Sequence, residues 1–366
     1  MIKVGVVGLG KMGLSHHALL HAHPDVDVVA CDMSKYVLGV LGKNTGVSTY
    51  GDYAKMLAEA ELDAVVIATP SGAHAGMIEA ALERDIDVFC EKPLTLSAAD
   101  SDRLAAAAAE RQLVTQVGYH NRYVAAFGEV KELLDAGAIG EITHVLGEAY
   151  GPVVLKQTGG TWRSKAGEGG GCLYDYAAHV INLINWYLGE PVGVGGTVLP
   201  RVFSQDTDDA AFSTLYFPAG KTGQISVYWS DESYRKMTTR VTIWGTAGRI
   251  FADRQECQVY LRDTAPIPAG YEQGWNVRYT TELTKPVWFY LRGEEYSAQI
   301  EAFIRQVQAR SPEGLNSFAA AAMTDKTIGM MVTDSRLGPS TRLASAAIES
   351  APLKRPRRGL RHRRAA

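Results

Sequence analysis

The sequence is poor in cysteine. Its four cysteines, Cys31, Cys90, Cys172 and Cys257, lie far apart and form no CxxC pair. This spacing excludes a disulfide framework and a zinc-ribbon pattern. The chain also lacks an apolar run of the ~20 residues needed to span a membrane, and its start lacks the basic region and cleavage site of a signal peptide. We therefore expect a cytoplasmic protein without membrane contact.

An excess of positive charge is absent except at the C-terminus. The formal net charge of the 366 residues is −3, yet residues 351–366 hold one lysine, six arginines and no acid. The remainder, with 30 basic and 40 acidic residues, is acidic, which argues against nucleic-acid binding by the globular part. We expect residues 341–366 to form a disordered basic tail.

The length indicates about two domains. Over residues 1–122, short apolar runs alternate with helical patterns, which predicts an α/β fold with a doubly wound parallel sheet, the Rossmann arrangement. The predicted strands are Lys3–Val7, Asp27–Cys31, Ala64–Ala68, Asp87–Cys90 and Val114–Val117, and the predicted helices are Lys11–Ala22, Ser34–Leu41, Tyr53–Ala60, His74–Arg84 and Ala98–Arg111.

Over residues 123–340 strands dominate, and many alternate apolar and polar residues. This pattern predicts an α+β domain with a large open, mainly antiparallel sheet and helices on one face. An exposed half-apolar sheet face also indicates self-association. The predicted strands are Ile142–Tyr150, Val192–Leu199, Ala210–Phe217, Gly223–Trp229, Thr239–Trp244, Gly248–Ala252 and Gln258–Leu261, and the predicted helices are Ala125–Ala136, Leu173–Leu188, Glu295–Ala309 and Ser317–Ser335.

The clearest motif is a GxGxxG loop between the first predicted strand and helix. Gly8 permits the tight turn, Gly10 lets a pyrophosphate approach the backbone, and Gly13 lets helix and strand pack closely. Asp32 ends the second strand, where an acid binds the ribose 2′-hydroxyl and repels a 2′-phosphate. We expect NAD, with NADP disfavoured, although nearby Lys35 weakens that preference. The alternative is a glycine-rich turn in a non-binding domain.

A second motif, Glu91-Lys92-Pro93, follows a strand, where ligands of open α/β sheets bind. Lys92 there can hydrogen-bond a substrate hydroxyl and favour its ionisation; the alternative is a surface lysine. In a third motif, three glycines precede a helix that carries Asp175 and His179 four residues apart on one face. His179 is a candidate general base, and the alternative is a helix-stabilising pair.

Four histidines, His16, His17, His21 and His23, cluster in and after the first helix. No carboxylate or cysteine completes a metal-ligand set with them. We interpret them as a solvated helix face and expect no metal site.

Together the motifs resemble the glucose–fructose oxidoreductase/inositol dehydrogenase/MocA (Gfo/Idh/MocA) family. The resemblance runs from Ile2 to about residue 335. It rests on Gly8–Gly13, Thr69-Pro70-Ser71 with His74, Glu91-Lys92-Pro93, Gly118–Arg122, Trp162-Arg163, and the run into Asp175 and His179.

The resemblance implies a Rossmann domain followed by an open-sheet domain, dimers or tetramers, and a sugar or cyclitol substrate. It implies hydride transfer between a secondary hydroxyl or ketone and nicotinamide, with Lys92 and His179 handling the proton and Asp175 supporting them. The implied cofactor-binding residues are Gly8, Leu9, Gly10, Lys11, Met12, Gly13, Asp32, Thr69, Pro70, Ser71, His74, Glu91 and Lys92, and the implied substrate-binding residues are Lys92, His120, Asn121, Trp162, Arg163, Asp175, Tyr176 and His179.

Two positions depart from the family pattern. Asn182 stands where an acid often follows the histidine, and His120-Asn121 stands where many members have Asn-Arg. Both departures bear on substrate identity. Two other functions stay open: an enzyme that retains NAD and uses it transiently in glycoside cleavage or elimination, and a non-catalytic nucleotide-sensing protein.

Overall fold

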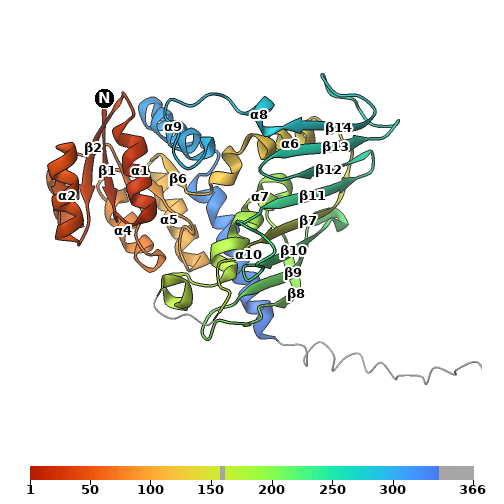
Figure 1. Cartoon of the computed structure of the whole chain (residues 1–366), viewed down its shortest axis with the longest axis horizontal. Coiled ribbons are helices and arrows are strands. Elements are labelled where there is room, and N and C mark those ends of the chain that lie inside the picture. Colours follow the sequence, from red (N-terminus) through yellow and green to blue (C-terminus); the bar gives the residue numbers. More distant parts are fainter. Residues whose placement is uncertain (157–160, 338–366) are drawn as a thin grey trace, which may run out of the picture. The chain divides into compact units, whose positions relative to one another are not determined.

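Figure 1 shows the fold in the computed structural model, which describes residues 1–156 and 161–337. The predicted tail, 341–366, and the last residues of the predicted second domain, 338–340, lie outside the described residues. Within the described ranges, no helix is long and apolar enough to cross a membrane.

The first sheet has six parallel strands in the order β3-β2-β1-β4-β5-β6. This confirms the predicted Rossmann arrangement, and the short edge strand β3 was not predicted. The strands are β1 (Ile2–Val7), β2 (Val26–Cys31), β3 (Ser48–Tyr50), β4 (Ala64–Ile67), β5 (Asp87–Cys90) and β6 (Thr115–Val117), and the helices between them are α1 (Lys11–His21), α2 (Lys35–Thr45), α3 (Tyr53–Glu59), α4 (His74–Leu82) and α5 (Ala98–Glu110).

This sheet is buried on both faces. Val4 and Val6 of β1 pack in one core with α1 and α2, whereas Val7 and the other face of β4 pack in a second core with α3, α4 and α5. Helices on both faces explain why all four residues of β4 are buried. Ser97 caps α5, because its hydroxyl accepts from the Asp100 N–H at 3.3 Å.

The second sheet has eight strands in the order β14-β13-β12-β11-β7-β10-β9-β8. All neighbours are antiparallel except β7 and β10, so the sheet is mainly antiparallel as predicted. The last strand was not predicted. The strands are β7 (Ile142–Tyr150), β8 (Gly193–Val198), β9 (Ala210–Tyr216), β10 (Thr222–Tyr228), β11 (Arg240–Gly245), β12 (Gly248–Ala252), β13 (Glu256–Leu261) and β14 (Gly274–Tyr279).

Helices cover one face of this sheet, and in Figure 1 α6 and α7 lie against it. The predicted helix Leu173–Leu188 begins with a π-helical turn, Leu173–Ala177, before regular α7. The short α8 was not predicted. The helices of this part are α6 (Ala125–Asp135), α7 (Ala178–Leu188), α8 (Thr280–Leu283), α9 (Glu294–Ala309) and α10 (Phe318–Arg336).

Helix α9 follows the second sheet in sequence but packs on the first. Its apolar residues Ile300, Phe303, Ile304 and Val307 share a core with β1, β2 and β4.

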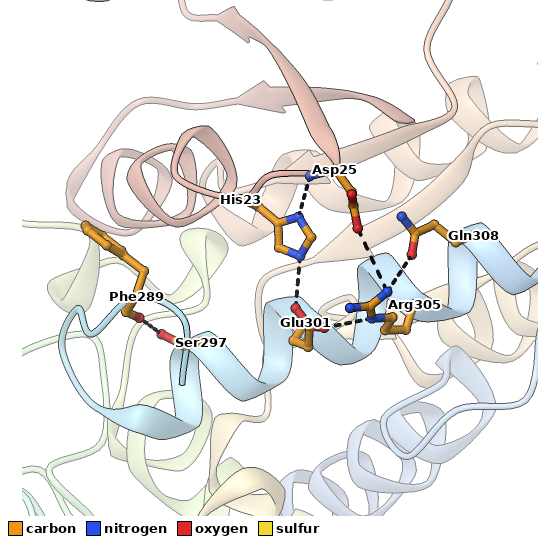
Figure 2. A network of polar contacts seen from close by, with 7 residues as sticks. All are labelled: His23, Asp25, Phe289, Ser297, Glu301, Arg305 and Gln308. Carbon is orange, nitrogen blue, oxygen red and sulfur yellow. Dashed lines mark hydrogen bonds and ion pairs between the residues drawn. The ribbon is translucent and has the colours of Figure 1, made fainter. Parts of the chain in front are cut away.

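Figure 2 shows the polar contacts between α9 and the loop after α1. The Asp25 N–H donates to His23 Nδ1 at 3.1 Å, so His23 Nε2 carries the proton that it shares with Glu301 Oε2 at 2.9 Å. Arg305 lies 3.9 Å from Asp25 and donates to Glu301 at 2.7 Å. A C-terminal helix therefore completes the core of the first half of the molecule.

Candidate active site

The loop after β1 has the geometry of a dinucleotide-binding turn. Gly8 has φ +83°, and a Cβ on Gly13 would lie 1.7 Å from the Gly8 carbonyl oxygen, so both positions require glycine. A Cβ on Gly10 would meet nothing within 4 Å. The backbone at Gly10 is thus open at the start of α1, where free N–H groups favour a phosphate.

Asp32, directly after β2, faces this loop. Its Oδ2 accepts from the Leu9 N–H at 2.6 Å, and its Oδ1 accepts from the Ser34 N–H at 2.7 Å. These contacts hold the carboxylate beside the glycine loop and leave each oxygen further acceptor capacity. Of the other predicted loop residues, Lys11 is exposed and Met12 is half-buried.

His74 connects two predicted cofactor segments. Its Nε2 lies 3.0 Å from the Thr69 carbonyl oxygen, and its Nδ1 lies 2.9 Å from that of Pro93. Burial lowers the pKa of His74. The buried ring therefore ties the turn after β4, with half-buried Ser71 and exposed Pro70, to the segment that carries Lys92.

Glu91 follows β5 and is held from two sides. His16 Nε2 lies 2.7 Å from Glu91 Oε1, and the Lys92 N–H donates to Oε2 at 3.2 Å. Burial raises the pKa of Glu91, but the contact with His16 and the charge of Lys92 outweigh it and lower that pKa. A Cβ on Gly118 would lie 2.7 Å from this carboxylate, which explains the glycine after β6.

The solvated histidine face expected on α1 is wrong. His16, His17 and His23 are buried, because α1 packs between the first sheet and α9. Burial and the charge of neighbouring His21 lower the pKa of His17 to about 4. Among the described residues, no cluster of three or more His, Cys, Asp or Glu side chains is arranged to hold a metal ion.

Lys92 and Asp175 meet as a nearly buried ion pair. Lys92 Nζ lies 2.9 Å from Asp175 Oδ1, and their side chains are 13% and 10% exposed. Arg163 Nε donates to Asp175 Oδ2 at 2.9 Å, and its guanidinium stacks on Trp162 at 4.7 Å from the ring centre. Burial opposes ionisation of Asp175, but Lys92 and Arg163 outweigh it and lower its pKa.

His179 lies in the first turn of α7 and is buried. Its ring centre is 5.9 Å from that of Tyr119 and 4.8 Å from that of His120. Its Nδ1 has no hydrogen-bond partner within residues 1–156 and 161–337. Burial, followed by the charges of Lys92 and Arg254, holds the pKa of His179 well below 6.5. The imidazole is therefore neutral near pH 7, as a general base must be.

The expected support of His179 by Asp175 is not what the structure shows. Asp175 lies in the π-helical turn, and its carboxylate is engaged by Lys92 and Arg163. Tyr176 is buried, and its ring packs edge-on against Trp229 in the core of the second sheet.

Sequence reasoning missed the residues around His120. Arg254, in the turn after β12, donates to His120 Nε2 at 3.2 Å and to Asn121 Oδ1 at 3.4 Å. Its guanidinium also pairs with Glu295 at the start of α9. Tyr296 stacks on His120 with ring centres 4.7 Å apart. More than 100 residues separate Arg254 and Tyr296 from His120 in the chain, and no local motif relates them.

The departure at Asn182 has a structural partner. Arg122 Nε donates to Asn182 Oδ1 at 2.7 Å, and its Nη2 donates to the Asn182 carbonyl at 3.1 Å. Burial lowers the pKa of Arg122 to about 10. Asn182 also donates to Thr324 Oγ1 at 3.1 Å, so this position supports packing between α7 and α10.

Two family models match the chain and together cover more than half of it. Residues 2–119 match the model described as "Oxidoreductase family, NAD-binding Rossmann fold" of GFO_IDH_MocA, and residues 127–251 match the GFO/IDH/MocA C-terminal domain. The chain belongs to the Gfo/Idh/MocA family. It is accordingly an NAD-dependent oxidoreductase, as the motifs predict.

Similar proteins agree over nearly the whole length. Myo-inositol 2-dehydrogenase of Thermotoga maritima is 25% identical over 329 residues, which are 86% of this chain and 91% of that protein. The structure of GenD2 from gentamicin A biosynthesis, in complex with NAD, is 27% identical with a TM-score of 0.74, covering 92% of this chain and 94% of that one. Levoglucosan dehydrogenase with NADH and levoglucosan has a TM-score of 0.79 at 22% identity, covering 92% and 97%, and shows the shared fold.

The described residues fit NAD. The open backbone at Gly10 and the N-terminus of α1 suit the pyrophosphate, and Asp32 suits the ribose hydroxyls. Glu91 and Lys92 follow β5 in the same parallel sheet, so they lie at the edge where its strands end. This edge is where open α/β sheets bind ligands.

Proposed function

We propose that this protein transfers a hydride between NAD and a secondary hydroxyl or ketone of a sugar, cyclitol or sugar derivative. The carrying observation is the nearly buried Lys92–Asp175 pair, 2.9 Å long, together with buried His179, whose pKa is held well below 6.5 by burial first and then by the charges of Lys92 and Arg254. The proposed site thus combines a cationic lysine with a neutral histidine that is close enough to feel its charge.

Lys92 and His179 have complementary tasks in this proposal. The Lys92 ammonium donates a hydrogen bond to the substrate oxygen and stabilises negative charge that develops there. His179, neutral, accepts the hydroxyl proton, and in the reverse direction its cation returns a proton to the ketone oxygen. NAD, when bound, accepts or supplies the hydride at its nicotinamide ring.

Asp175 and Arg163 position Lys92. Asp175 binds Lys92 through a carboxylate oxygen at 2.9 Å, and its backbone carbonyl accepts from the same ammonium at 3.0 Å. With its second oxygen on Arg163, the carboxylate is fixed and balances one of the two cations. We assign Trp162, Arg163, His120 and Asn121 to the substrate-binding side of the site. Arg163 pairs with Asp175 and stacks on Trp162, and His120, next to Asn121, packs edge-on against His179.

Two relatives support the substrate class. The Thermotoga protein is named for myo-inositol, a cyclitol, and the levoglucosan dehydrogenase structure contains an anhydrosugar. Both ligands present secondary hydroxyls on a rigid ring. The proposed reaction at Lys92 and His179 needs one such hydroxyl. Further hydroxyls on the same ring could bind the polar side chains assigned to the substrate, Arg163, His120 and Asn121.

The test is a substrate panel with the purified protein. Inositols, sugars and anhydrosugars are mixed with NAD, and NADH formation is followed by absorbance. We expect substrate-dependent NADH from at least one ring polyol. Tightly held NAD with product formation but no net NADH would support the transient-redox alternative instead. Absence of NAD binding would contradict the whole proposal.

We also propose that residues 1–122 bind the nucleotide, that residues from 123 bind the substrate and assemble the oligomer, and that the oligomer is a homodimer or homotetramer. The second sheet supports self-association, because large apolar side chains are exposed along several of its strands. They are Val198, Phe212, Tyr216, Tyr260, Trp275, Val277 and Tyr279. Sedimentation of the full chain distinguishes these states from a monomer.

A further inference from the structure

His120 sits between two aromatic neighbours beside the proposed base. On one side its ring centre is 4.8 Å from that of His179, in an edge-to-face contact. On the other, Tyr296 of α9 stacks on it at 4.7 Å with an interplanar angle of 20°. The ring plane is therefore fixed, and what remains to be set is which nitrogen carries the proton.

Arg254 determines which of the two ring nitrogens of His120 carries the proton. A guanidinium has only hydrogen-bond donors, and Arg254 Nη1 contacts His120 Nε2 at 3.2 Å. Nε2 must therefore be the acceptor, so the proton of neutral His120 is on Nδ1. Within residues 1–156 and 161–337, the structure shows no second hydrogen bond to a His120 ring nitrogen. The Nδ1–H is thus left as a donor that the protein itself does not use.

Arg254 is itself held. Glu295, 6% exposed, forms an ion pair with its guanidinium, and Asn121 Oδ1 accepts a further hydrogen bond at 3.4 Å. The turn after β12, the 3₁₀ turn His120–Tyr123 and α9 thereby converge on one guanidinium. The fold therefore fixes the position of the Arg254 guanidinium.

We propose that Arg254 is a positioning residue that locks His120 as the neutral Nδ1–H tautomer, so that His120 donates a hydrogen bond to a substrate oxygen beside His179. The inference rests on the proposed function and deepens it, because it makes His120 a specificity determinant. The ring then selects substrates that present an acceptor oxygen next to the reacting carbon, as vicinal diols and hydroxyketones do.

The charged groups around His120 act in the same direction. They are Arg254 from the turn after β12, Lys92 after β5, Arg292 before α9, and His179 of α7, while Glu295 is engaged by Arg254. Burial first, and then these neighbours, hold the pKa of His120 well below 6.5. A neutral His120 adds no positive charge beside His179, so it does not lower the proton affinity of His179 further.

The direct test reads the tautomer by nitrogen NMR of the NAD-bound protein labelled at histidine, with His120→Asn to assign the signal. We expect one neutral tautomer with the proton on Nδ1 in the wild type. We expect Arg254→Met to give mixed tautomers and Arg254→Lys, which also donates, to restore the single one. A wild-type ring protonated on Nε2 or on both nitrogens near neutral pH overturns the inference, whatever the activity.

Kinetics supply the second readout. With a polyol that the wild type oxidises, we expect Arg254→Met to lower kcat/KM about 10- to 100-fold, mostly through KM. The reason is that His120 is then no longer held as a hydrogen-bond donor to the substrate. The matched control is Arg292→Met. It removes a guanidinium that stacks on Tyr296 at 5.3 Å and acts on His120 through its charge, not through a hydrogen bond to its ring, and we expect less than about a threefold effect. Equal losses in both variants would overturn the positioning role, whereas absence of turnover by the wild type with every polyol would count against the proposed function alone.

Discussion

Lys92 Nζ and Asp175 Oδ1 lie 2.9 Å apart although 83 residues separate them in the chain. One follows β5 of the nucleotide-binding sheet, and the other lies in the π-helical turn that leads into α7. This pair joins the two halves of the proposed site. An extra residue in a helical turn is a frequent feature of functional sites, and here it places the carboxylate on Lys92 and leaves His179 free.

The glycine loop gives a pair of variants with opposite expectations. Gly10→Ala adds a Cβ into open space, so we expect unchanged thermal stability and a weakening of NADH binding by about tenfold or more, because the methyl group occupies the pyrophosphate position. Gly13→Ala places its Cβ 1.7 Å from the Gly8 oxygen, so we expect loss of stability. Thermal unfolding and NADH fluorescence titration measure both. Unimpaired NADH binding by Gly10→Ala would contradict the cofactor assignment.

We predict that Asp32 sets the choice between NAD and NADP. Asp32→Asn keeps the shape of the side chain but removes the charge that repels a 2′-phosphate. We expect the wild type to prefer NADH and the variant to lose at least about tenfold of that preference. Separate titrations with NADH and NADPH measure this preference. The control is Lys35→Ala, which removes a nearby positive charge from an exposed position. A wild type that prefers NADPH would refute this role.

The low pKa of His179 leads to a prediction for the pH dependence of the reaction on the acid side. Because its pKa is held well below 6.5, the neutral base persists as pH falls through that value. For hydroxyl oxidation we therefore expect no drop in kcat/KM at the ordinary histidine pKa of about 6.5. His179→Asn is expected to lower kcat about 100- to 10,000-fold. A drop centred on the ordinary histidine pKa in the wild type would show that the base is not this buried imidazole.

Buried Asp325 of α10 should make the free energy of unfolding depend on pH. Burial raises its pKa to about 7, although Ser101 Oγ donates to it at 2.7 Å and the Thr95 N–H at 3.2 Å. A carboxyl whose pKa is raised by folding stabilises the protein below its unfolded pKa, and this stability is lost as pH rises towards 7. Asp325→Asn removes that titration, so its stability relative to the wild type should rise between about pH 5 and pH 8, by about 2 to 3 kcal/mol.

Urea unfolding at both pH values, without NAD, measures the Asp325 effect. Asp135→Asn is the control, because Asp135 is exposed and pairs with Lys131 on the surface. A wild type and an Asp325→Asn variant whose stabilities run parallel over this pH range would show that Asp325 is ionised throughout.

Local patterns in the sequence predict much of the fold and site. The spacing of Gly8, Gly10 and Gly13 defines a turn within a few residues, and it is confirmed in detail. The helical period of α9 indicates an apolar face but not its partner, so its packing on the first sheet was not predicted. The expectation that His16 is solvated was wrong for the same reason, since its partner Glu91 lies 75 residues away.

The surroundings of His120 were beyond prediction as well. Arg254 reaches it across 134 residues, through the order of strands in the second sheet. A sequence pattern records which residues share an element, whereas the tertiary topology decides which elements meet. Residues that the family motifs carry, such as Lys92 and His179, can therefore be proposed from the sequence, and those that only the topology brings in cannot.

The most direct test of the account replaces Lys92 by methionine, which keeps the length of the side chain and removes its charge. Single-turnover mixing of NAD-loaded protein with a polyol that the wild type oxidises, followed by NADH absorbance, measures the hydride-transfer step. The account predicts a loss of at least about 100-fold with NADH binding retained, and a comparable loss in His179→Asn. Wild-type turnover by Lys92→Met, with the same substrate and folded protein, would contradict it.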